Sequence, residues 1–197
     1  MTMLIPFASL VPVPWKNGGG CTTEIMAEPP GALFHDFDWR ISLATIAQDG
    51  PFSLFPGVDR TLALVEGPGL TLDVDDSGRF VLGDEDTIIE FAGESAIQAA
   101  LHGGPTIDFN VMTRRAACHH KFGRRRVEGR SVFAPRGDWS VLFLADGEGL
   151  SVCSDDERIG LVRFDAVIFD TETVWTLEAD EATIFIVDIF FGTPPLL

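Results

Sequence analysis

Glycine and proline recur at short intervals along the whole chain, and this spacing limits the length of any regular element. The sequence holds 20 glycines and 12 prolines. Between them lie short apolar runs rich in β-branched residues, leucine and phenylalanine, a pattern typical of short strands joined by turns. The best helix candidate, residues 93–101, also fits a strand. We therefore expect an all-β fold with at most a short helix or two. The clearest expected strands cover residues 39–47, 60–65, 70–74, 87–91, 107–113, 139–145, 174–177 and 183–190.

An internal repeat indicates two copies of one β-unit, although a chance match of two strand–glycine–strand segments is the alternative. Residues 62–72 and 142–152 align 80 positions apart, with five of 11 positions identical. Each copy reads as strand, acidic-Gly-x-Gly turn and strand, which predicts a hairpin because glycine supplies the positive φ of tight turns. We expect two small barrels, in domains 1–115 and 116–197. The basic stretch 114–130 is expected to be a spacer between them.

Acidic residues outnumber basic ones by 30 to 14, which gives a formal charge of −16. Such a surface repels phosphate backbones and anionic lipids, so nucleic acid and membrane surfaces are not expected as partners. The basic run 121–126 is expected to pair with acidic loops such as 84–86 or 155–157. No apolar stretch is long enough for a membrane span, and the start of the chain does not read as a signal peptide. Three widely spaced cysteines suit a reducing compartment, so we expect a cytoplasmic protein.

Metal chemistry is poorly supported by the four histidines. His119 and His120 are adjacent, so on a strand they point to opposite faces. No HxH or HxxxH spacing occurs, and we expect neither a metal nor another cofactor.

The segment 14–25 holds three consecutive glycines between Lys16 and Glu24. Backbone N–H groups at Gly19 and Gly20 could turn toward a bound anion, and Lys16 would add a positive charge. A flexible turn leading into the first sheet is the other interpretation.

Two further segments place polar side chains on strand faces. Strand alternation puts Arg40 opposite the apolar face of 39–47, and puts Arg60 on the side of Leu62 and Leu64. An arginine in that register lies at a barrel mouth or is paired inside the barrel, or it is a strand-end arginine bonded to a loop acid. In 108–114, Asn110 and Arg114 share a mixed polar face that lines a pocket or faces solvent.

Four uncommon strings in these segments resemble the HutD/Ves family: residues 14–25, 39–47, 52–62 and 108–114. The resemblance implies two cupin-like (double-stranded β-helix, jelly-roll) barrels in one chain, a bicupin. It also implies a metal-free branch of the cupins that is linked to histidine utilisation. The family is thought to regulate by binding a metabolite, with formylglutamate or urocanate as ligand.

The leading hypothesis is a non-catalytic protein, alone or as a homodimer, that senses or buffers a small anionic metabolite. Arg60 is the expected anchor, and the other expected ligand-binding residues are Lys16, Arg40, Asn110, Arg114, Trp15, Phe55, Gly19 and Gly20. One alternative is a metal-free enzyme with Glu24 as general base. The other is an interaction module whose barrel is filled and has no pocket.

Overall fold

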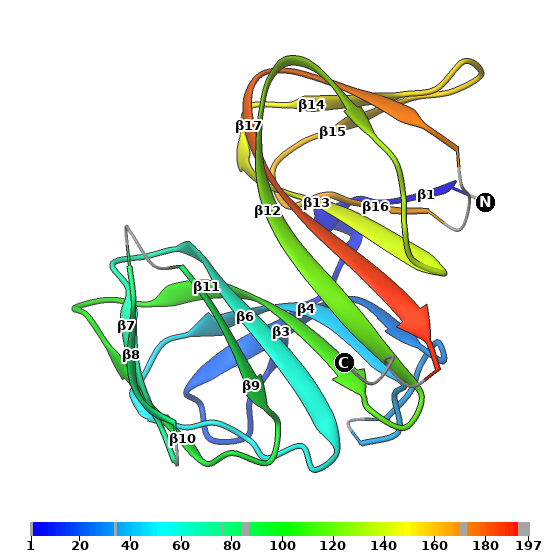
Figure 1. Cartoon of the computed structure of the whole chain (residues 1–197). Coiled ribbons are helices and arrows are strands. Elements are labelled where there is room, and N and C mark those ends of the chain that lie inside the picture. Colours follow the sequence, from blue (N-terminus) through cyan, green and yellow to red (C-terminus); the bar gives the residue numbers. More distant parts are fainter. Residues whose placement is uncertain (1, 34, 76, 84–86, 170–172, 193–197) are drawn as a thin grey trace. The chain divides into compact units, whose positions relative to one another are not determined.

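The computed structural model describes residues 2–33, 35–75, 77–83, 87–169 and 173–192 (Figure 1). Apart from the short 3₁₀ turn η1 (Phe7–Ser9), every regular element in these ranges is a strand, which confirms the all-β expectation. The segment that could have been a helix contains strand β10 (Ile97–Leu101). None of the described helices is long and apolar enough to cross a membrane. By Cα proximity the chain divides into two compact units.

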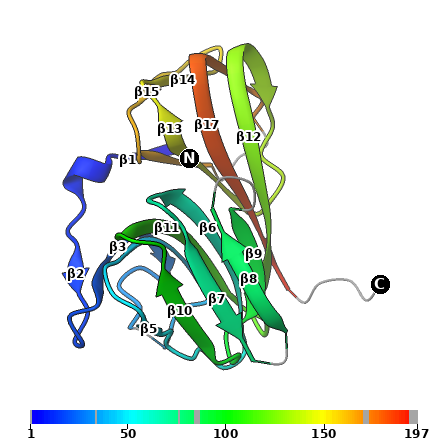
Figure 2. The ribbon, with the colours of Figure 1, turned by 90° about the vertical axis from the view of Figure 1, so that its left-hand side faces the viewer.

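The first unit, Val11–Cys118, contains two antiparallel sheets that can be followed in Figure 2. The six-stranded sheet runs β2 (Val13–Pro14), β3 (Gly20–Glu28), β4 (Trp39–Ile46), β11 (Thr106–Arg114), β6 (Val58–Glu66), β9 (Ile88–Ala92). The four-stranded sheet runs β5 (Gly50–Pro51), β10, β7 (Leu70–Val74), β8 (Gly78–Leu82). Leu62 and Leu64 of the larger sheet share one apolar cluster with Leu72 and Ile97 of the smaller one. The core of this unit therefore lies between the sheets, as in a barrel or sandwich.

The second unit comprises the start of the chain up to Leu10 and His119–Gly192. Its sheet runs β1 (Thr2–Ile5), β16 (Ala166–Phe169), β13 (Trp139–Gly147), β17 (Trp175–Phe191), β14 (Leu150–Cys153), β15 (Arg158–Leu161), and β12 (Cys118–Phe133) also pairs with β17. The Phe7 N–H donates a hydrogen bond to Asp165 Oδ1 at 2.8 Å. This bond and the β1–β16 pairing join the first residues of the chain to its last third.

The repeat occupies comparable places in the two units, but the predicted hairpins are wrong. In neither copy do the two strands pair with each other: β6 and β7 lie in different sheets, and β13 and β14 lie on opposite sides of β17. A Cβ at Gly67 (φ 112°) would lie 2.5 Å from the Pro105 carbonyl oxygen, and one at Gly147 (φ 122°) would lie 2.7 Å from that of Glu181. Both glycines thus allow close backbone approach where the chain leaves one strand of the repeat for the next.

The basic stretch is also a strand and not a spacer. It forms most of β12, where Arg126 pairs with Glu181 at 3.0 Å and Arg130 pairs with Glu178, both on β17. Basic side chains two or four positions apart share a strand face, so a charged run can follow a charged partner strand. Of the two acidic loops expected as partners, 84–86 lies outside the described residues. The two strands expected at 174–177 and 183–190 are parts of the single strand β17, which begins at Trp175.

Candidate ligand-binding site

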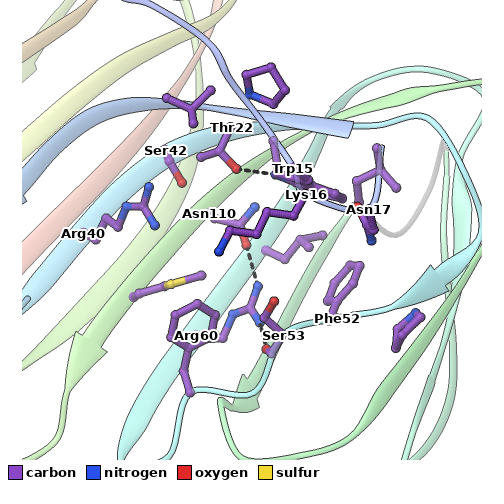
Figure 3. A pocket seen from close by; sticks show the side chains of 18 of the residues that line it. Trp15, Lys16, Asn17, Thr22, Arg40, Ser42, Phe52, Ser53, Arg60 and Asn110 are labelled. Atoms are coloured by element: carbon purple, nitrogen blue, oxygen red, sulfur yellow. Dashed lines mark hydrogen bonds between the residues drawn. The ribbon is translucent and has the colours of Figure 1, made fainter. Parts of the chain in front are cut away.

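A cavity of about 760 Å³ opens in the first unit. Its walls come from the segment before β3, from β4, from the loop 51–55, and from β6 and β11. This volume is in the usual range for small-molecule sites. Figure 3 shows Lys16, Arg40, Arg60 and Asn110 turned toward the same space.

Arg60 lies at the inner wall of this cavity and is only 6% exposed. Its Nη2 donates to Asn110 Oδ1 at 3.0 Å, and Nη1 makes a longer contact of 3.4 Å with the Ser53 carbonyl oxygen. Nε is buried without a hydrogen-bond partner. Within the described ranges no carboxylate forms an ion pair with this guanidinium, and burial lowers its pKa to about 10. Arg60 is therefore a buried cation to which the described residues supply no counter-charge.

Aromatic rings surround the same guanidinium. Its Cζ lies 4.8 Å from the ring centroid of Phe91, 5.4 Å from that of Phe55 and 5.5 Å from that of Phe52. Ring faces stabilise a cation partly and also exclude water from it. The rings thus fix the side chain in a dry setting, where an approaching anion would be attracted strongly.

The turn between β2 and β3 carries Trp15, Lys16 and Asn17 to the cavity. Within it the N–H of Gly18 donates to the Trp15 carbonyl oxygen at 3.0 Å, and that of Gly19 donates to Asn17 Oδ1 at 3.0 Å. Trp15 Nε1 donates to Thr22 Oγ1 at 2.8 Å, which holds the indole over the strand. Two of the three glycine N–H groups therefore stabilise the turn itself, and neither Gly19 nor Gly20 is among the residues that line the cavity.

Arg40 lines the cavity from β4, and its Nε donates to Glu24 Oε2 at 2.8 Å. Glu24 does not line the cavity. The carboxylate expected as general base in the enzyme alternative is thus the partner of an arginine beside the site.

Two residues of β11 that share the face of Asn110 do not line the cavity. Arg114 donates through Nε to the Phe37 carbonyl oxygen at 3.0 Å, and through Nη2 to that of His35. Asp108 is fully buried, accepts a hydrogen bond from Thr106 Oγ1 at 3.0 Å, and has a pKa that burial raises to about 7. On this face the strand therefore carries two cavity residues, Asn110 and Met112, together with one core acid and one loop anchor.

Several cavity residues are not predicted by the sequence pattern. Phe52 and Ser53 belong to the candidate segment 52–62, but strand alternation gives no direction for loop side chains. His35 lies in the irregular segment before β4, and no pattern marked it.

The cavity lining carries Lys16, Arg40 and Arg60 but, in the described part of the chain, no carboxylate. Most of its polar groups are hydrogen-bond donors, which match a ligand rich in acceptor oxygens. Its one histidine is His35, and the described residues hold no cluster of three or more histidine, cysteine or acidic side chains that could bind a metal ion.

The antiparallel sheets around this cavity give the chain a cupin-like fold. The chain belongs to the HutD family, whose model matches residues 8–187, and this confirms the resemblance seen in the sequence. It is 35% identical over 175 residues to Protein Ves of Citrobacter koseri, covering 82% of this chain and 88% of that one.

Two solved structures share this fold over almost their full length. A conserved protein of unknown function from Pseudomonas aeruginosa PAO1 has a TM-score of 0.87 and 26% identity, covering 96% of this chain and 99% of that one. HutD from Pseudomonas fluorescens SBW25 (formate condition) has a TM-score of 0.82 and 25% identity, covering 98% and 100%.

Proposed function

We propose that this protein binds a small carboxylate metabolite in the cavity of its first unit, with Arg60 as the anchor. The observation that carries the proposal is the buried Arg60 guanidinium, which has no carboxylate partner among the described residues. An uncompensated buried charge is costly, and a ligand carboxylate would supply the missing charge. Charge-assisted hydrogen bonds of this kind contribute about 1.5–3 kcal/mol each.

The other polar groups of the lining favour a ligand with acceptors at both ends. Asn110 Oδ1 accepts a hydrogen bond from Arg60, so the NH₂ group of Asn110 remains to donate to a ligand. Lys16 and Arg40 supply positive charge elsewhere on the lining. Formylglutamate carries two carboxylates and an amide, whereas urocanate carries one carboxylate and an imidazole. The donor set therefore favours formylglutamate of the two.

Binding without catalysis is the function that the site supports best. The groups expected of an acid–base enzyme are few, because the described lining holds one histidine, His35, and no carboxylate, and Glu24 is paired with Arg40. A filled, pocketless module is disfavoured by the cavity itself.

The family name HutD links this binding to histidine utilisation, where the protein would sense or buffer its ligand in the cytoplasm, alone or as a homodimer. Three free cysteines accord with a reducing compartment. We also propose that the two units are the two barrels of a bicupin, since the repeat strands β6 and β13 each lie between two partner strands of their own sheet.

Isothermal titration calorimetry with formylglutamate and with urocanate tests the proposal. We expect dissociation constants near the micromolar range, about −8 kcal/mol, for the preferred ligand. Arg60→Ala should remove the binding heat, whereas Arg79→Ala, which truncates an exposed arginine of β8, should leave it unchanged. Absence of heat for both compounds at millimolar concentration would reject this class of ligand.

A further inference from the structure

Arg114 anchors a backbone segment instead of facing the cavity. Its two side-chain hydrogen bonds go to the carbonyl oxygens of Phe37 and His35, and its Cζ lies 5.7 Å from the Phe37 ring centroid. Its backbone N–H also donates to the Asp38 carbonyl oxygen at 2.7 Å. One arginine at the end of β11 thus holds segment 35–38 by three hydrogen bonds and one ring face.

That segment packs directly on a wall of the cavity. The Phe37 ring is 1% exposed and lies 6.1 Å from the ring of Phe55, and the His35 ring lies 6.0 Å from the same ring. Phe37, Phe55 and Met112 belong to one small apolar cluster, separate from the main core of the unit. His35, Phe55 and Met112 also line the cavity.

Phe55 in turn contacts the anchor, because its ring centroid lies 5.4 Å from the Arg60 guanidinium. A continuous series of contacts therefore runs from Arg114 through segment 35–38 to Phe55 and Arg60. Aromatic packing of this kind transmits displacement, because a well-packed cluster leaves little space to absorb it.

We propose that Arg114 is a positioning residue of the ligand site: it fixes segment 35–38, and through it holds the Phe55 ring against the Arg60 guanidinium. This inference rests on the proposed function only where it concerns ligand affinity. Arg114 itself touches no ligand, and the loss of its side chain acts by loosening one wall of the cavity.

Hydrogen exchange of the ligand-free protein tests the contact series directly. In Arg114→Ala, the amides of Asp36, Asp38 and Phe55 should exchange about 10-fold faster, because each is hydrogen-bonded in or beside the loosened wall. The amide of Leu72, on β7 of the other sheet, should keep its rate. Unchanged exchange at Phe55 would overturn the proposal, even if Asp36 and Asp38 exchanged faster. Arg114→Lys, which keeps the charge and one donor, gives an intermediate rate and serves if the alanine variant does not fold.

Titration with formylglutamate supplies the second readout. Arg114→Ala should weaken binding about 10-fold in the wild-type background, but less than twofold in a Phe55→Leu background, where the wall is already changed. Equal losses in both backgrounds would mean that Arg114 acts on the ligand directly, and would overturn the inference. If the wild-type protein binds no formylglutamate, the proposed ligand is wrong, and the exchange rates alone decide the role of Arg114. Arg79→Ala is the control for loss of an arginine.

Discussion

Arg60 combines three conditions that rarely occur together: deep burial, ring faces on its guanidinium and no acidic partner in the described structure. Each condition excludes water or leaves charge uncompensated, and their sum favours an anion at that point. The shape of the guanidinium adds to this, because two parallel N–H groups match the two oxygens of a carboxylate.

Replacement of Arg60 by lysine should therefore weaken binding although the charge is kept. We expect Arg60→Lys to lose about 10- to 100-fold in affinity for formylglutamate, because an ammonium group cannot make the two parallel hydrogen bonds. The melting temperature should change little, and calorimetry with thermal unfolding measures both. Wild-type affinity in this variant would show that charge alone, and not the shape of the guanidinium, is recognised.

The buried Asp108 should make stability depend on pH. Its folded-state pKa, about 7, is raised above the unfolded value, so its protonated form is favoured by folding. Stability should thus be complete below about pH 4 and decline as the pH rises through 7; between pH 5 and pH 8 the loss relative to Asp108→Asn should be on the order of 3 kcal/mol, because part of the loss has already occurred below pH 5. Denaturant unfolding of both proteins at pH 5 and pH 8 measures the difference. Parallel stability curves for the two proteins would contradict it.

Strand alternation predicted the direction of these side chains but not their depth. It placed Arg60 on the side of Leu62 and Leu64, and Asn110 and Arg114 on one mixed polar face. The structure puts Arg60 and Asn110 in the cavity. Arg114 has the same parity as Asn110 but stands at the last position of β11, where a loop carbonyl replaces the cavity as its neighbour. Alternation along a strand predicts the face on which a side chain lies. It does not predict where the strand ends, because that depends on tertiary packing.

The turn between β2 and β3 depends on close backbone approach at Gly20. A Cβ built there would lie 2.1 Å from the Thr45 carbonyl oxygen and 3.1 Å from the Trp15 ring. The triple glycine therefore has a packing role at this position, in addition to the internal hydrogen bonds of the turn. Because Lys16 lies on this turn, its place at the cavity depends on the same approach.

Gly20→Ala should displace the turn and weaken ligand binding. We expect a loss of about 1–3 kcal/mol in the free energy of unfolding, as for other overpacked sites, together with reduced formylglutamate affinity. Gly160→Ala in β15 is the matched control, because nothing lies within 4 Å of its built Cβ. Thermal unfolding and titration measure the stability and the formylglutamate affinity of both variants. Equal values for the two variants would contradict the packing role of Gly20.

Whole elements were predicted more reliably than their pairing. The short strands between glycines and prolines were predicted, since short apolar runs rich in β-branched residues and bounded by turn residues are typical of strands. The two repeat hairpins failed because a glycine turn fixes local φ but does not decide which strand becomes the partner. The same limit applies to the charged run in β12, whose acidic partner strand lies far away in the sequence.

Across the whole molecule, a chain of charge −16 is proposed to attract an anion into a cavity with three cations. The electric field of the acidic surface and that of the cavity cations differ in range. Salt screens exposed charges beyond roughly 10 Å at 0.1 M but screens buried groups much less. The surface therefore opposes the encounter of an anion with the protein, while the cavity favours the bound state.

Association with an anionic ligand should accordingly become faster as salt is added. We expect the association rate constant for formylglutamate to rise about two- to fivefold between 10 and 150 mM NaCl, the reverse of ordinary electrostatic steering. Stopped-flow fluorescence, with Trp15 in the cavity lining as reporter, measures it. A rate that falls with salt would show that the cationic lining dominates the approach as well.

Pairing of β1 with β16 has a consequence for synthesis of the chain. Thr2 lies opposite Phe169, so β1 must wait until β16 has been synthesised before its backbone groups can pair with that strand. Until then its unpaired backbone groups are open to other chains. Emergence of the first unit, Val11–Cys118, therefore does not complete the sheet to which β1 belongs.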